Sequence, residues 1–259
     1  VFESPDEGEE GVEVTKVTIP ASVTKIGARA FYECQLTEVI FETGSTLREI
    51  GESAFAYCTK LPEITLPDGL EVIGVRAFDG DSRLTEIAIP ASVTTIGAYA
   101  FELCSGLTSV QFANGLTSQL KTIGDFAFYQ CYRLTHIEIP EGVVSIGDSA
   151  LRISRGLTSV SLPSTLERLG TAAPLVFAPA NESGQFSGTD DLISITVAEG
   201  NRNYSSRDGL LYTADGKTLL YCPAGRTGTV TVADGTQVID TYAFHHSQAS
   251  HVALPDGLQ

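Results

Sequence analysis

The sequence of 259 residues has no tryptophan and few basic residues, since only 16 lysines and arginines stand against 32 aspartates and glutamates. The formal net charge is −16. Phosphate binding needs a clustered basic footprint, so this charge argues against nucleic acid and, for the same reason, against an anionic membrane surface as partner. A cationic partner, divalent ions or simple colloidal solubility remain compatible with the acidic sign.

Long apolar runs and catalytic motifs are also missing. No stretch approaches the about 18 apolar residues of a membrane-spanning helix, and the N-terminus lacks the basic and apolar regions of a signal peptide. Neither Gly-x-Ser-x-Gly nor His-Glu-x-x-His occurs. We therefore expect no enzyme, no cofactor and no membrane insertion. A hydrolase in the irregular region 171–226 would rest on that irregularity alone.

What the sequence does contain is an internal repeat of about 23 residues. Ile-Gly pairs recur at positions 26–27, 50–51, 73–74, 96–97, 123–124 and 146–147, and Leu169-Gly170 is a weaker copy. Four residues after the Ile of each of the six Ile-Gly pairs comes Ala, followed by Phe or, in the sixth, by Leu. Such a period is typical of a solenoid, in which stacked coils bury Ile, Ala and Phe in continuous columns.

Each unit begins with alternating apolar and polar residues, as in Leu84–Ile89, which predicts a short strand that Pro90 ends. The Gly-x-x-Ala-Phe segment predicts a turn and a short helical stretch that returns the chain, so the expected class is an α/β repeat solenoid. We expect an acidic flexible lead at 1–13 and one solenoid at 14–259. The last residues resemble the opening of another repeat, which predicts a fragment of a longer chain.

Two segments depart from the rhythm near the C-terminus. The pattern dissolves at 171–191, which predicts an irregular insertion. Apolar runs at 210–212 and 218–221 flank Thr213–Lys217, which predicts a β-hairpin insertion within about 203–226. Extra residues at 42–45 and 113–119 are expected on outer loops.

The unit L-T-x-I-x-I-P-x-x-V-x-x-I-G-x-x-A-F-x-x-C resembles the BspA-like, or Treponema pallidum-type, leucine-rich repeats from about Val14 to Leu258. The segments Asn203–Ser206 and Asp208–Tyr212 resemble the N-Y-S-S and D-G-x-L-Y of that family. This resemblance implies a curved right-handed superhelix with parallel strands on its concave face, in secreted or cell-surface proteins for which adhesion has been proposed. It implies no catalytic residues.

Cysteines at 34, 58, 104 and 131 each lie eight residues after their Ile and so form one column, in which Asp81 and Ser154 replace Cys. Buried free thiols are the favoured interpretation, and a Cys34–Cys58 disulfide is the alternative. No Cys-x-x-Cys supports zinc, and the spacing of His245, His246 and His251 fits no metal-ligand pattern. Asn181 and Asn203 match the N-glycosylation pattern, which matters only in a secretory eukaryote.

Outward strand positions give the candidate binding residues. One predicted column contains Lys16, Glu38, Glu63 and Glu86, and parallel neighbours about 4.8 Å apart would make the three glutamates a like-charge ladder. The ladder predicts a surface for a cation or a basic partner, and the alternative is three solvated carboxylates. The binding residues predicted on the concave face are Glu38, Glu63, Glu86, Gln111, His136 and Glu138.

These features predict a secreted or cell-surface module that binds another protein or an extracellular matrix component. The alternative is a structural spacer that displays a neighbouring domain without binding anything itself.

Overall fold

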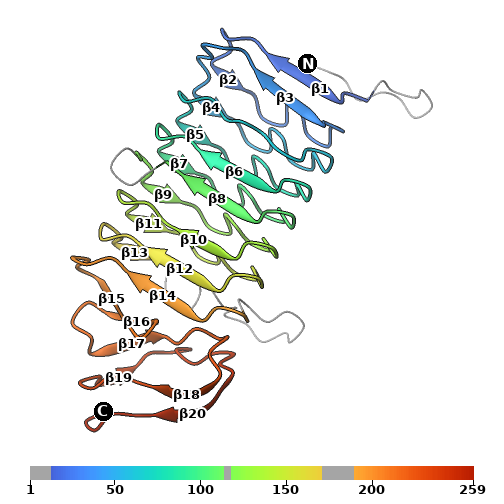
Figure 1. Cartoon of the computed structure of the whole chain (residues 1–259). Coiled ribbons are helices and arrows are strands. Elements are labelled where there is room, and N and C mark those ends of the chain that lie inside the picture. The colour runs from blue at the N-terminus through green and yellow to red at the C-terminus, as the bar shows by residue number, and fades with distance from the viewer. Residues whose placement is uncertain (1–12, 114–117, 171–189) are drawn as a thin grey trace.

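The structure, a computed structural model, describes residues 13–113, 118–170 and 190–259. Its coils stack along one axis, with longer strands on one side (Figure 1). We call this side the strand face; it consists of residues 62–66 and the strands β1 (Lys16–Ile19), β3 (Glu38–Phe41), β6 (Glu86–Ile89), β8 (Ser109–Phe112), β10 (His136–Glu138), β12 (Ser159–Leu162) and β14 (Ser194–Val197). The predicted short strands are therefore present in most coils.

A second row of strands, which the sequence did not predict, coincides with the Ile-Gly positions. Seven two-residue strands form one continuous parallel sheet, the back sheet, in the order β13-β11-β9-β7-β5-β4-β2. They are β2 (Lys25–Ile26), β4 (Glu49–Ile50), β5 (Val72–Ile73), β7 (Thr95–Ile96), β9 (Thr122–Ile123), β11 (Ser145–Ile146) and β13 (Arg168–Leu169).

The glycine after each isoleucine allows neighbouring backbones in the back sheet to approach closely. A Cβ added to Gly97 would lie 2.6 Å from the carbonyl carbon of Gly74, closer than real Cβ contacts come. In the first coil, a Cβ at Gly27 would have nothing within 4 Å. The glycine column thus serves coil stacking.

The predicted helical return, and with it the α/β class, is wrong, because the described residues contain no helix. Between the back sheet and the cysteine column the chain forms successive turns, which we call the turn ladder. Ala30 N–H donates locally to the carbonyl of Gly27, whereas Phe31 N–H donates to the carbonyl of Ala54 in the next coil at 2.8 Å. This alternation leaves no run of helical i to i−4 hydrogen bonds.

The residue before each alanine of the turn ladder has a positive φ, between 52° and 61°, which an α-helix of L-residues excludes. These residues are Arg29, Ser53, Arg76, Tyr99, Phe126 and Ser149. None of them is glycine, so the turn conformation is maintained by the hydrogen bonds between coils. No helix that could cross a membrane is found in the part of the chain that the structure describes.

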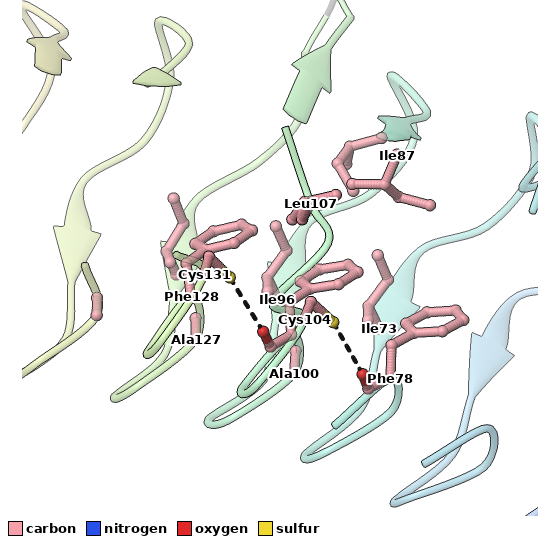
Figure 2. Packing of buried hydrophobic residues seen from close by; sticks show 14 of the residues in the cluster. Ile73, Phe78, Ile87, Ile96, Ala100, Cys104, Leu107, Ala127, Phe128 and Cys131 are labelled. Carbon is pink, nitrogen blue, oxygen red and sulfur yellow. Dashed lines mark hydrogen bonds between the residues drawn. The ribbon is translucent and has the colours of Figure 1, made fainter. Parts of the chain in front are cut away.

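The core consists of stacked columns, as predicted. Phe78, Phe101 and Phe128 are fully buried, and successive rings lie 5.4 and 5.3 Å apart and nearly parallel (Figure 2). Beside them, the Cys104 thiol donates to the Phe78 carbonyl at 3.1 Å, and the Cys131 thiol to the Phe101 carbonyl at 3.3 Å (Figure 2). The cysteine column is thus part of the packing.

Unlike the back sheet, the strand face is broken into short pieces. Its strands pair as β1-β3, β6-β8 and β10-β12-β14 only. Residues 62–66 form no strand; Pro62 and Pro67 at their two ends have no N–H to donate to the preceding coil. The break between β8 and β10 follows the coil with extra residues, and Pro140 likewise has no N–H to donate there.

The C-terminal region has its own arrangement. The strands β15 (Tyr204–Arg207), β16 (Leu210–Thr213) and β17 (Thr218–Tyr221) pair antiparallel, and β17 pairs in parallel with β19 (Val238–Ile239). β18 (Gly228–Thr231) pairs in parallel with β20 (Ala249–Ala253). A second core lies here, around Tyr212, Leu219 and Val230.

Some predictions lie outside the described residues. They are the acidic lead, except Glu13, most of the insertion at 171–191 including Asn181, and the centre of the 113–119 loop.

Candidate functional site

The register of the strand face brings the predicted polar columns together in pairs. Lys16 lies opposite Glu38, Glu86 opposite Ser109, and His136 opposite Ser159. Two residues further along each strand is a second column of outward positions, in which Ala88 lies opposite Gln111, and Glu138 opposite Ser161. The columns were therefore placed correctly from the repeat alone.

Glu38 already has a charged partner. Its carboxylate accepts from the Lys16 ammonium at 2.8 Å, and this hydrogen bond raises the pKa of Lys16. Both side chains are exposed, so the pair is weak and screened by salt. The Lys16 ammonium thus balances the negative charge of Glu38.

Strand pairing does not run through all three glutamates of the predicted ladder. Glu63 lies in the stretch that forms no strand, so no strand pairing joins it to Glu38 or Glu86. Glu63 and Glu86 are both exposed and instead line one groove of about 510 Å³ together with Asp68 and Gln111.

Three grooves follow one another along the strand face. The first, about 520 Å³, shares Thr65, Leu66 and Asp68 with the groove of Glu63 and Glu86. That groove shares Gln111, Phe112 and Ala113 with a third of about 770 Å³, which extends to Ala198. The three together form one continuous depression.

The lining of this depression has charge of one sign. No lysine or arginine is among the described residues that line it. Its acidic residues are Glu42, Glu63, Asp68, Glu86, Glu138 and Glu141. We call the three grooves together the acidic trough.

The acidic side chains of the trough differ in what they already bind. The Glu141 carboxylate accepts from the backbone N–H and hydroxyl of Ser164 at 2.9 and 2.8 Å, and Glu42 accepts from the Ala21 N–H at 3.0 Å. Within the described residues, the carboxylates of Glu63, Glu86 and Glu138 have no such partner. These three are available to a ligand.

Gln111, His136 and Glu138 all line the third groove, so the structure brings three of the six predicted residues to one place. His136 Nδ1 lies 2.7 Å from the Ser159 hydroxyl, which orients the imidazole across the strands. Sequence reasoning missed Asp68 and Glu141 in the trough. Each directly follows the repeated proline of its coil, Pro67 or Pro140, a position that could have drawn attention to them.

The other candidate sites are structural. All five cysteines are free, and burial raises the pKa of the Cys58, Cys104 and Cys131 thiols, so they are poor nucleophiles. No group of three or more metal-ligating side chains that could hold a metal ion occurs in the described residues, the histidines near β20 included. Asn203 is exposed beside β13 and donates to the Leu166 carbonyl at 3.4 Å.

Comparison with known proteins identifies the family of this chain. Residues 10–118 and 76–175, more than half of the chain, match the model of the BspA type leucine-rich repeat region, with six copies. The chain belongs to the BspA-type leucine-rich-repeat family. BspA-type repeats and their fold are typical of non-enzymatic scaffolds that bind other proteins. No curated protein matches this BspA-type chain in sequence.

Several solved structures resemble this BspA-type chain. The pneumococcal vaccine antigen PcpA is 26% identical over 95% of this chain and 46% of its own, with a TM-score of 0.50. A leucine-rich cell surface protein of Faecalibacterium prausnitzii is 24% identical over 92% and 60%, with a TM-score of 0.59. A repeat protein of Eubacterium ventriosum is 19% identical over 77% and 49%, also at 0.59. The chain thus spans about half the length of these structures.

Proposed function

We propose that this chain is the interaction module of a secreted or cell-surface protein, and that it holds a basic region of another protein or of an extracellular matrix component in the acidic trough. The observation that best supports this proposal is the lining of the trough. It has available carboxylates on Glu63, Glu86 and Glu138, and no lysine or arginine is among its described residues. A basic partner would gain three charge-assisted contacts there.

The likeness to a vaccine antigen and to a cell surface protein supports a surface location. A binding role agrees with a scaffold whose repeated Ile, Ala and Phe positions serve packing, because the outward side chains of the strand face are then not needed for the core.

The test is the binding of a short, unstructured lysine-rich peptide to the folded chain. Replacing Glu63, Glu86 and Glu138 together by Gln removes three carboxylates and leaves the core intact. At about 0.2–1 kcal/mol for each exposed contact, affinity should fall by about 3-fold to 150-fold. Binding should also weaken with salt.

A matched control removes the same charge elsewhere. Glu52, Glu167 and Glu199 are exposed and line none of the three grooves, so changing them together to Gln tests net charge alone. If both triple variants lose the same affinity for the peptide, the binding depends on the net charge of the chain and not on the trough, and the proposed site is refuted. A chain that binds no lysine-rich peptide would favour a structural spacer.

A further inference from the structure

Part of the apolar lining of the trough lies on β8, beside the groove of about 770 Å³. Val110 and Phe112 are only half-buried. The residues in register with them in β6, Ile87 and Ile89, are 1% and 3% exposed. β8 therefore leaves apolar surface open that the preceding coil covers.

The open surface coincides with a break in the strand face. β8 pairs only with β6, and β10 pairs only with β12, so no sheet joins β8 to β10. Ile96 and Ile123 are 27 residues apart, whereas Ile73 and Ile96 are separated by 23, so the β8 coil has four extra residues. Pro140 also has no N–H to donate to the end of β8.

The resulting groove has the size and the lining of a binding pocket. Its volume of about 770 Å³ lies within the about 300–1,000 Å³ usual for such sites. Val110 and Phe112 supply apolar surface, while Gln111, His136 and Glu138 add polar groups. A large apolar side chain beside a charged contact is the usual composition of an interface hot spot.

We propose that the groove between β8 and β10 is an anchor pocket that takes one large apolar side chain of an extended partner segment, next to a lysine or arginine that pairs with Glu138. The proposal rests on the proposed function and adds the class of ligand. The charge of the lining selects the basic residue, and the open Val110 and Phe112 surface selects the apolar one. An extended segment fits because the three grooves form one long, continuous depression.

The test compares three labelled peptides that differ only at their centre, which is Lys-Phe-Lys, Lys-Ala-Lys or Glu-Phe-Glu. The folded chain should bind the Lys-Phe-Lys peptide about tenfold more tightly than the Lys-Ala-Lys peptide, because one large apolar side chain becomes buried. The Glu-Phe-Glu peptide should bind most weakly.

Ser109 lines the groove, so the indole ring of Ser109→Trp should fill it. The preference of the chain for the Lys-Phe-Lys peptide over the Lys-Ala-Lys peptide should then fall below about twofold. Ser105 lies in the same coil, is equally half-buried and does not line the groove, so Ser105→Trp should keep the preference. Gln111→Trp, at an exposed position that lines the groove, serves if Ser109→Trp does not fold.

Equal binding of the Phe and Ala peptides, or a preference that persists in the folded Ser109→Trp and Gln111→Trp chains, overturns the anchor pocket. If in addition both lysine peptides lose affinity in the triple Gln variant of the trough, the proposed function stands without the anchor. If no lysine peptide binds the chain, both proposals fall.

Discussion

Asp81 should make the stability of the solenoid fall as the pH rises. It is fully buried in the cysteine column, where one carboxylate oxygen accepts from the Cys58 N–H at 2.7 Å and the other has no hydrogen-bond partner. In the same column, Ser154 donates its hydroxyl to the Phe128 carbonyl at 2.8 Å. An ionised carboxylate cannot donate in this way.

Burial raises the pKa of Asp81 well above its ordinary value of 3.8, the Cys58 N–H opposes that shift, and the charge of Asp79 adds to it. In the unfolded chain Asp81 ionises near pH 3.8, so below that pH its carboxyl is protonated in both states and costs the fold nothing. Between pH 3.8 and the higher folded pKa only the unfolded chain ionises, which lowers the free energy of unfolding by about 1.4 kcal/mol per pH unit.

Asp81→Asn removes the ionisation and keeps an oxygen for the Cys58 N–H. At pH 7 the variant should be more stable than the parent by up to about 4 kcal/mol, the limit reached if the folded carboxyl is still protonated there. The gain should shrink toward zero as the pH approaches 3.8.

Urea denaturation followed by circular dichroism, at several values between about pH 4.5 and pH 7.5, measures this difference. The other ionisable groups near Asp81, which are Asp79, Arg76, Cys58 and Cys104, are present in both proteins, so they largely cancel in the comparison. A gain that stays constant with pH would refute the reasoning, because it would then come from packing and not from ionisation.

Three further substitutions test the stacking. Gly97→Ala should destabilise the chain strongly, through contact with the Gly74 backbone, whereas Gly27→Ala should be nearly neutral in thermal melting. Phe101→Ala opens a cavity in the buried ring column and should lower the free energy of unfolding by about 3–5 kcal/mol, measured in urea; a loss below about 1 kcal/mol would contradict the packing described. Ser149→Gly relieves a positive φ and should stabilise the fold by up to about 1 kcal/mol, while Ser149→Val should destabilise it.

The repeat allowed the strand face, its columns and the buried rings to be predicted, because apolar spacing and coil length determine which residues stack. The turn ladder could not be predicted, since its left-handed positions are occupied by residues such as Arg76 and Tyr99 rather than glycine. Its conformation depends on hydrogen bonds to the next coil, which no local pattern reveals.

The break that separates Glu63 from Glu38 did have a signal, in Pro62 and Pro67. The groove beside β8 is different, because no sequence pattern shows that Val110 and Phe112 stay half-exposed. Both are apolar, as are the buried residues in register with them, Ile87 and Ile89, so their exposure had to be observed in the structure.

The turn ladder also determines the electrostatics of the backbone. Its N–H groups donate forward, as from Phe31 to Ala54, whereas those beside the back sheet donate backward, as from Gly51 to Ile26. Peptide dipoles on the two sides of each coil therefore oppose one another, in contrast to the aligned dipoles of an α-helix. The dipole of the stack therefore grows less with each added coil than it would if every peptide dipole pointed the same way.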